Sequence, residues 1–289
     1  MSILIDNRTR ALVQGATGAV GSFQCRVMLS YGTRIVGAVT PGKAGEHVHG
    51  IPVYEFVEDA VRLHQPNAAL SFVPARFVRD AALEVIDAKI PLLVITAEGV
   101  PDWDMAAIIG VAGNKGVTVL GPDTPGLISP GKCKLGVHPE RMFLEGRVGV
   151  LSKSGALSYE VGRILTEHGI GQSTVVGIGG GPIWGMRQAT VLGLFEEDPE
   201  TKAVVLLGEI GGTMEIEAAE FMRDGMTKPV IALIVGRSAP QGVRMGHAGA
   251  IIEGSGSTAE GKIEALRGAG ALIVKRPSEL PAILTRLGI

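Results

Sequence analysis

The sequence contains little cysteine, little aromatic side chain and almost no net charge. Its two cysteines, Cys25 and Cys133, lie far apart and match no metal-ligand spacing, so we expect a reducing, cytoplasmic setting and no metal site. The net charge is −2 without a basic tail or stripe, which argues against nucleic acid or an anionic membrane as a partner. Apolar runs stay below membrane-spanning length, and residues 1–6 lack the pattern of a secretory signal.

Small and branched aliphatic residues dominate the amino-acid composition of the chain. Hydrophobic residues make up 46% of the chain and aromatic residues only 4%, which favours buried parallel strands covered by helices. The 42 glycines suit several tight turns between strands and helices. A length of 289 residues allows one large or two ordinary α/β domains.

The first half alternates regularly between apolar strand-like runs and helical segments. Strands are predicted over residues 10–14, 34–39, 68–73, 92–96 and 118–120. This alternation predicts a doubly wound parallel sheet, in which ligands bind at the carboxyl ends of the strands. Those ends carry residues 15–20, 40–43, 73–74, 96–98 and 121–124.

A glycine-rich turn follows the first predicted strand. Gly15, Gly18 and Gly21 have GxxGxxG spacing, and such a turn can bring main-chain N–H groups and a helix start toward a phosphate. The next strand ends near Lys43 and not near the acidic residue expected of an NAD site. A cation there favours an extra phosphate, as on NADP or coenzyme A. A turn without a ligand and a solvated lysine remain the alternatives.

The alternation breaks over a stretch rich in turn residues. We therefore predict a first domain over residues 1–126, a linker over 127–146 and a second domain over 147–289. The second domain again alternates, with strands expected over 147–151, 174–178, 203–207 and 230–235.

Three polar features follow strands of this second domain. Glu209 comes after one strand, His247 lies in a glycine-rich loop after the next, and Ser154-Gly155 begins a helix. A carboxylate bonded to one imidazole nitrogen fixes the tautomer and makes the other nitrogen the better nucleophile. A helix start with a serine cap can bind an anion. Together these features predict a histidine that carries a phosphoryl group, although each alone is compatible with a purely structural role.

A P-loop-like pattern lies near the C-terminal end. Gly256 to Lys262 match GxxxxGK, but Ile263 stands where serine or threonine should hold Mg²⁺. We therefore expect no ATP site on this chain and expect another subunit to supply the nucleotide.

Taken in order, the motifs of the chain resemble those of the succinyl-CoA synthetase (succinate–CoA ligase, NDP-forming) α-subunit family. The matching stretches include SILID, QGxTG, VTPGK, TxEGxP, VGIGG, LGEIGG and GxxAPxGxRMGHAGAI. The resemblance implies a Rossmann-like CoA-binding domain followed by a flavodoxin-like doubly wound domain. It also implies a β subunit with an ATP-grasp domain, which binds NTP and Mg²⁺, in an αβ or α2β2 assembly with a carboxylic acid as substrate.

The resemblance also assigns roles to individual residues. It implies that His247 is the phosphohistidine and that Glu209 orients it. Contacts with CoA are implied for Thr17, Gly18, Ala19, Val20, Lys43, Thr96, Ala97 and Glu98. Tyr159 is expected beside the acid substrate, and Ser154 and Gly155 are expected to hold phosphate.

Several positions depart from the family pattern, among them Lys153, Ala156 and Ser158 in the stretch where the family has SRSGTLTYE. Gly181 stands where the family has aspartate, Met186 where it has serine or threonine, and Asp123-Thr124 where it has asparagine and cysteine. These changes lie in loops expected near the acid, so malate, citrate or a substituted propionate are alternatives to succinate. An NADP-dependent oxidoreductase and a non-catalytic CoA-binding regulator are further alternatives. The sequence does not distinguish ATP from GTP or αβ from α2β2.

Overall fold

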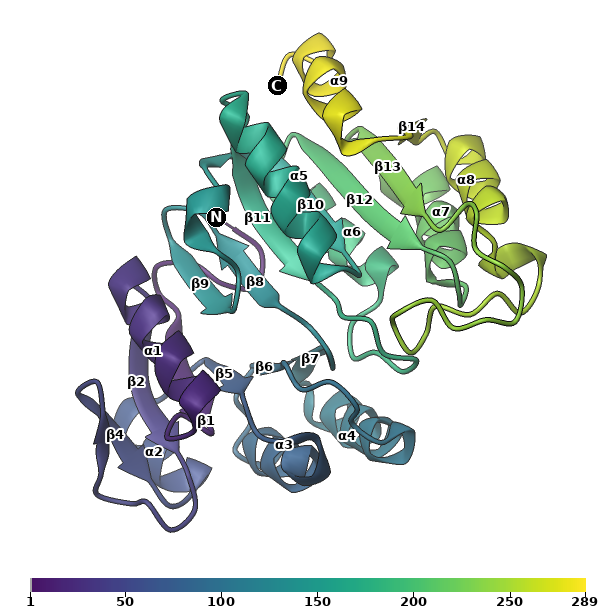
Figure 1. The fold of residues 1–289 in the computed structure, drawn as a ribbon. Helices are drawn as coiled ribbons and strands as arrows, with labels where there is room; N and C mark the ends of the chain where they lie inside the picture. Colours follow the sequence, from purple (N-terminus) through teal and green to yellow (C-terminus); the bar gives the residue numbers. More distant parts are fainter. Residues whose placement is uncertain (1) are drawn as a thin grey trace.

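A computed structural model describes residues 2–289 as two α/β lobes, each built on a seven-stranded sheet (Figure 1). Both sheets are mainly parallel, which confirms the predicted fold class. The apolar runs of the sequence form the buried strands, because a strand covered by helices on both faces has no side chain in water.

The first lobe has the strand order β3-β4-β2-β1-β5-β6-β7. All neighbours are parallel except β3 and β4, so the six parallel strands have the order of a Rossmann sheet. The strands are β1 Arg10–Gln14, β2 Arg34–Val39, β3 His47–Val48, β4 Ile51–Tyr54, β5 Ala68–Ser71, β6 Leu92–Ile95 and β7 Thr118–Leu120.

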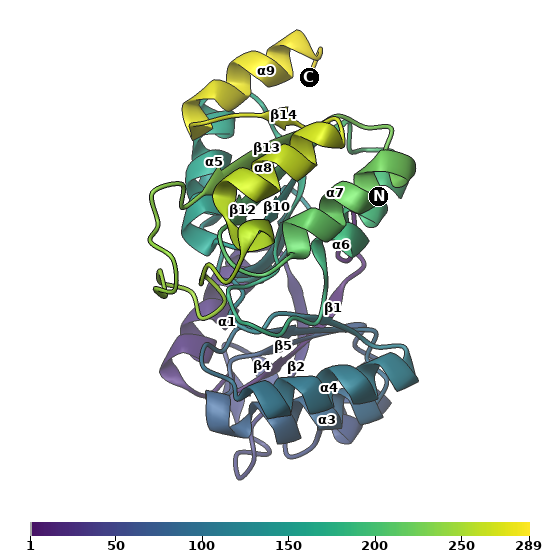
Figure 2. The ribbon, with the colours of Figure 1, turned by 90° about the vertical axis from the view of Figure 1, so that its right-hand side faces the viewer.

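Helices cover both faces of this first sheet. One face is covered by α1, and the opposite face by α2, α3 and α4. Figure 2 shows α3 and α4 side by side. The helices are α1 Ala19–Tyr31, α2 Val57–His64, α3 Val78–Asp87 and α4 Asp102–Lys115, with a short 3-10 turn at Ala75–Phe77.

The second lobe has the strand order β14-β13-β12-β10-β11-β8-β9. The five parallel strands, β10 to β14, follow the flavodoxin-like order, with β10 between β11 and β12. The strands are β8 Gly126–Ser129, β9 Cys133–Gly136, β10 Glu145–Ser152, β11 Gln172–Gly177, β12 Ala203–Glu209, β13 Val230–Val235 and β14 Leu272–Ile273.

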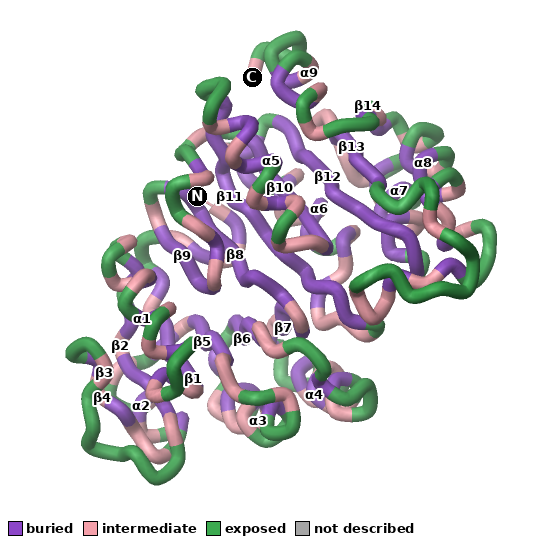
Figure 3. The backbone as a smooth tube through the Cα atoms, viewed as in Figure 1, coloured by how far each residue is buried: buried purple, intermediate pink, exposed green. Residues whose placement is uncertain are grey.

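Helices α5 and α9 lie on one face of the second sheet, and α6, α7 and α8 on the other (Figures 1 and 2). They are α5 Gly155–Glu167, α6 Gln188–Glu197, α7 Met214–Gly225, α8 Ala259–Gly268 and α9 Leu280–Arg286, with 3-10 turns at Glu140–Met142, Ser255–Ser257 and Pro277–Glu279. Figure 3 shows the central strands buried along their length, whereas the long loop after β13 is largely exposed.

The segment over 127–146 is not a bare linker. It contains most of β8, all of β9 and the start of β10, and the β8–β9 hairpin pairs antiparallel with β11 at the edge of the second sheet. These strands were not predicted, because they are short and rich in glycine and proline neighbours, and their partner β11 lies far along the sequence. The domain boundaries themselves stay a prediction.

The hairpin also connects the two lobes. The hydroxyl of Thr33, after α1, donates to the carbonyl of Lys134 at 2.7 Å and accepts from its N–H at 3.0 Å. The Tyr31 hydroxyl accepts from the Gly131 N–H at 2.9 Å. The loop after β7 also contacts the turn after β11, because the Gly185 N–H donates to the Gly121 carbonyl at 2.9 Å. The strand ends of the two sheets therefore approach each other.

Candidate active site

Glu209 is the last residue of β12 and lies on the carboxyl edge of the second sheet. The whole strand is buried, and Glu209 pairs in register with Val235 at the end of β13. Because neighbouring parallel strands end at the same edge, the loop that follows β13 begins beside Glu209.

That loop, residues 236–254, folds back over the edge and carries His247. The Ala250 N–H donates to the His247 carbonyl at 3.1 Å, and the Gly249 N–H donates to the Gly180 carbonyl at 3.3 Å. Gly211 has a φ of +87°, and a Cβ there would lie 2.0 Å from the Gly249 carbonyl oxygen. Only glycine therefore permits the loop to lie this close to the end of β12.

The structure brings His247 and Glu209 into direct contact. Nδ1 of His247 lies 2.8 Å and 3.0 Å from the two carboxylate oxygens of Glu209. Because a carboxylate only accepts, Nδ1 carries the proton and Nε2 of the neutral ring keeps its lone pair. This hydrogen bond raises the pKa of His247 above its usual value of 6.5. The imidazole is 31% exposed and the Glu209 side chain 10%, so the carboxylate is enclosed while the ring can be reached.

The imidazole also packs against the glycine turn after β11. A Cβ on Gly180 would lie 2.5 Å from Cγ of His247, so the ring packs directly on the main chain there. Asp123, from the first lobe, lies in the same region. Burial raises the pKa of the Asp123 carboxyl, the charge of Glu98 raises it further, and the charge of His247 lowers it. Carboxylates from both lobes therefore gather around one imidazole.

The other departures from the family pattern have different surroundings. A Cβ on Gly181 would come no closer than 3.4 Å to its nearest neighbour, Pro122, so the turn has room for a side chain. Met186 is buried in the apolar core. Thr124 is also buried, and its hydroxyl donates to the Gly177 carbonyl at 2.5 Å and accepts from the Gly126 N–H at 2.8 Å. These two hydrogen bonds of Thr124 hold the segment where the chain passes from the first lobe to the second.

The start of α5 has the predicted serine cap. The Ser154 side chain accepts from the Leu157 N–H at 3.3 Å, and the Ser154 N–H donates to the Ser152 hydroxyl at 3.0 Å. The Tyr159 hydroxyl lies 3.4 Å from the position of a Cβ on Gly155, so both predicted residues adjoin the same helix start. Their strand, β10, neighbours β12 in the sheet, which puts them on the same edge as Glu209.

The predicted CoA-contact residues are spread over several loop ends of the first lobe. Thr17 donates its hydroxyl to that of Thr40 at 3.2 Å, and Thr96 donates to the Ser71 carbonyl at 2.8 Å. Gly18 caps α1, which starts at Ala19, and Val20 is exposed. Ala97 accepts from the Asp123 N–H at 2.9 Å. Glu98 is exposed, and Lys43 forms an exposed ion pair with Glu46 at 3.0 Å.

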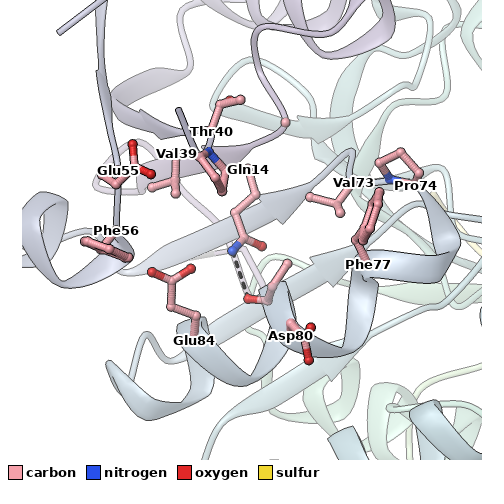
Figure 4. Close-up of a pocket in the computed structure, with 13 residues that line it drawn as sticks. Gln14, Val39, Thr40, Glu55, Phe56, Val73, Pro74, Phe77, Asp80 and Glu84 are labelled. Atoms are coloured by element: carbon pink, nitrogen blue, oxygen red, sulfur yellow. Dashed lines mark hydrogen bonds between the residues drawn. The ribbon is translucent and has the colours of Figure 1, made fainter. Parts of the chain in front are cut away.

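A pocket of about 700 Å³ opens at the carboxyl ends of β1, β2 and β5 (Figure 4). None of the residues with a predicted CoA role lines it, although five residues of the predicted strand ends do. It is lined by Gln14, Gly15, Val39, Thr40, Pro41, Glu55, Phe56, Val73, Pro74, Phe77, Asp80, Ala81 and Glu84. Sequence reasoning missed Phe56 because the segment containing β4 and α2 has no clear period. Phe77, Asp80 and Glu84 were read only as part of a helix.

Among residues 2–289, no group of three or more His, Cys, Asp or Glu side chains is placed to hold a metal ion. In the same range, no helix is long and apolar enough to cross a membrane.

Two family profiles match the chain in the order of its lobes. The CoA binding domain matches residues 6–99, and the CoA-ligase domain matches residues 151–272. Among curated proteins, the succinate–CoA ligase [ADP-forming] α subunit 1 of Archaeoglobus fulgidus is 54% identical over 95% of this chain and 94% of its own. The corresponding α subunit of Methanothermobacter thermautotrophicus is 52% identical over 99% of this chain and 98% of its own.

Solved structures share the whole architecture. ATP citrate lyase from Methanothrix soehngenii, in complex with citrate and coenzyme A, aligns with a TM-score of 0.87 at 25% identity. The alignment covers 99% of this chain but only 52% of that one, so this chain spans about half of the lyase. A dinucleotide-forming acetyl-coenzyme A synthetase of Ca. Korarchaeum cryptofilum, at 23% identity and a TM-score of 0.75, shares the fold. On the identity and coverage of its curated relatives, the chain belongs to the succinate–CoA ligase α-subunit family.

Proposed function

We propose that this chain is the α subunit of an NDP-forming acid–CoA ligase that converts succinate, CoA and NTP to succinyl-CoA, NDP and phosphate. The observation that carries the proposal is the contact between His247 and Glu209, at 2.8 Å, on the exposed edge of a CoA-ligase domain. The curated relatives are named as ADP-forming, which makes ATP the first nucleotide to test.

In the proposed cycle, Nε2 of His247 attacks the γ-phosphorus of the nucleotide and NDP leaves. A carboxylate oxygen of the acid then attacks that phosphorus, and the N–P bond breaks to give an acyl phosphate. The CoA sulfur finally attacks the acyl carbon and releases inorganic phosphate. Glu209 holds the proton on Nδ1 and stabilises the cationic ring that forms when Nε2 bonds to phosphorus. The N–H groups at the start of α5, near Ser154 and Gly155, suit a phosphate ion.

The first lobe supplies a site for CoA in this proposal. The residues first expected there are Thr17 to Val20, Lys43 and Thr96 to Glu98, and the pocket at the ends of β1, β2 and β5 adds a cavity that could hold part of the molecule. The start of α1 packs tightly on the glycine turn, because a Cβ on Gly21 would lie 2.2 Å from the Gly15 carbonyl oxygen. Main-chain N–H groups at such a helix start suit a phosphate.

The nucleotide is expected on a partner. Relatives named as α subunits imply a second subunit, and we propose that it carries an ATP-grasp domain with the NTP and Mg²⁺. Lys262 of the P-loop-like pattern is buried, which agrees with the absence of a nucleotide role for that stretch. A cytoplasmic location is also proposed, since Cys25 and Cys133 are both free and buried.

The experiment that tests the function is reconstitution with the cognate partner subunit and a panel of acids. Succinate should give the highest turnover, with malate, citrate and a substituted propionate as competitors. Asp123 and Gly181 differ from the family near the proposed acid site, so a higher rate with another acid would change the substrate while keeping the chemistry. CoA binding without turnover on any acid would favour a regulator instead.

Filling the pocket should separate CoA binding from NADP binding. An Ala81→Trp variant should weaken CoA binding about tenfold or more, because the indole would occupy the cavity at the ends of β1 and β5. Ala106→Trp, an identical change on the exposed side of α4, is the matched control. Isothermal titration measures both variants with CoA and with NADPH. Tight NADPH binding in place of CoA binding would support the oxidoreductase alternative.

A further inference from the structure

Three charged side chains lie buried directly beneath Glu209. Lys153, Glu215 and Lys262 are 2%, 0% and 0% exposed. Nζ of Lys153 lies 3.1 Å from one Glu215 carboxylate oxygen, and Nζ of Lys262 lies 2.5 Å from the other. The three residues come from the β10–α5 turn, the start of α7 and the start of α8. Two ammonium groups thus share one carboxylate.

This cluster holds the main chain of Glu209 on both sides. The Glu209 N–H donates to the Glu215 carboxylate at 3.2 Å, and the Glu209 carbonyl accepts from Nζ of Lys262 at 2.7 Å. Nζ of Lys262 also donates to the carbonyl of Gly211 at 2.5 Å. Gly211 supports the loop that carries His247, so a single ammonium group fixes both the orienting carboxylate and the support of the histidine loop.

Stability alone gives no reason for such a cluster. Removing charges from water is costly, and apolar replacements of buried ion pairs are often neutral or stabilising. Burial also lowers the pKa of Lys262. What an apolar side chain at position 262 could not make are the hydrogen bonds from Nζ of Lys262 to the main-chain carbonyls of Glu209 and Gly211.

The sequence around Lys262 fixes its place. Thr258 caps α8 by accepting from the Gly261 N–H at 3.0 Å, and a Cβ on Gly261 would lie 2.3 Å from the Ser255 carbonyl oxygen. Glycine at 261 therefore lets the helix start close to the preceding turn, and the next residue points inward. The GxxxxGK pattern thus has a structural use that involves no nucleotide.

We propose that Lys262 is a positioning residue for phosphoryl transfer: by binding the main-chain carbonyls of Glu209 and Gly211, it holds the carboxylate and the histidine loop in the geometry that His247 needs. The inference rests on the function proposed above. Lys262 touches neither substrate nor the reacting nitrogen, and it acts through Glu209.

Lys153 provides the matched control. Lys262→Met and Lys153→Met each remove one ammonium group from Glu215 and leave the other, so a one-to-one buried pair remains in both variants. Only Lys262→Met removes the bonds to Glu209 and Gly211. Both variants should fold, which thermal unfolding and CoA binding to the first lobe would establish.

The test measures phosphorylation of His247 in the complex with the partner subunit, using γ-labelled ATP, for both variants and wild type. Lys262→Met should slow phosphorylation about 100-fold, the effect typical of a misplaced catalytic group, and Lys153→Met should slow it less. Lys262→Arg, which keeps a cation and several donors, should recover most of the lost rate. Equal rates in wild type and Lys262→Met, or equal losses in the two methionine variants, would overturn the proposal.

The pH dependence separates positioning from a general loss of structure. Glu209, Asp123 and Lys153 are the charged groups that act on the pKa of His247: the two carboxylates raise it and the lysine lowers it. A misplaced Glu209 should therefore lower the pKa, and the rise of rate with pH should move to lower pH in Lys262→Met. Lys153→Met removes a positive charge and should move it to higher pH. Shifts in the same direction would contradict the proposal.

Different results would contradict the proposed function and the proposed role of Lys262. If wild type acquires no acid-labile phosphate with its partner, the proposed function is wrong. If wild type is labelled and Lys262→Met is labelled at the same rate, the function stands and the role of Lys262 does not. If Lys262→Met fails to fold, the pH profile of Lys262→Gln decides, because the shorter neutral amide cannot reach both carbonyls: slower phosphorylation with a shift to lower pH supports positioning, and an unchanged profile with full rate opposes it.

Discussion

Replacing His247 by asparagine should abolish phosphoenzyme formation and lower ligase turnover about 10⁴-fold or more, the scale of loss seen when a covalent nucleophile is removed. Asparagine keeps a polar side chain that can still bond to Glu209, but its amide nitrogen has no lone pair free to attack phosphorus. The measurement is incorporation of label from γ-labelled ATP in the complex with the partner, as phosphate that is lost in acid and stable in base.

His168→Asn is the control for this experiment. His168 is exposed at the end of α5 in the same lobe, and its Nδ1 lies 2.8 Å from the carbonyl oxygen of Ile164. That variant should label normally, and CoA binding should be unchanged in both. Full labelling of His247→Asn would place the nucleophile on a different residue and remove the basis of the proposed cycle.

Replacing Glu209 by glutamine should lower phosphorylation about 10³-fold or more, because a neutral amide can no longer fix the tautomer or stabilise the cationic ring; loss of the equivalent carboxylate in serine proteases costs about 10⁴. The side-chain amide can instead donate to Nδ1, which leaves the proton on Nε2, the nitrogen that must attack. The variant should still bind CoA and melt near the wild-type temperature.

The pH profile of the same variant has a predicted direction. Attack requires a neutral imidazole, so the wild-type rate should rise with pH through a pKa that the Glu209 hydrogen bond has raised above 6.5. Without that carboxylate the pKa of His247 falls, and the rise should occur at lower pH although the maximum rate is smaller. Single-turnover phosphorylation across pH measures both quantities. A rise at unchanged pH would mean that Glu209 is not the group that sets the pKa.

Much of the fold follows from the sequence where the signal is local. The bounds of β1, β2, β7 and β13 agree with the apolar runs, because each run is interrupted by turn residues at the edge of the sheet. The strands β3, β4, β8, β9 and β14 were missed. Two of them, β4 and β8, have polar or turn-forming neighbours and are specified by their partners β2 and β11. When a strand is specified by a partner far away in the chain, its own residues need not show the hydrophobic periodicity from which a strand is predicted.

The candidate site likewise has a part that the sequence predicts and parts that it does not. The contact of Glu209 with His247 could be expected, because adjacent parallel strands end together and the two side chains follow adjacent strands. The pocket in the first lobe could not be assembled, since Phe56 and Glu84 reach it from separate elements. The role of Lys262 was hidden for another reason: a lysine in a helix start reads as solvated, and only the packing shows that its ammonium group is buried.

The β8–β9 hairpin has a consequence for the order of folding during synthesis. Every strand of the first sheet has been made once Leu120 leaves the ribosome, so that sheet can form early. The hairpin follows at once in the sequence but belongs to the second sheet, where β8 pairs with β11, which ends at Gly177. Helix α1 packs against β9 and therefore waits for this later strand before its outer face is covered. We expect the nascent first lobe to expose that face until the second sheet begins to assemble, which makes it the surface most in need of protection from aggregation.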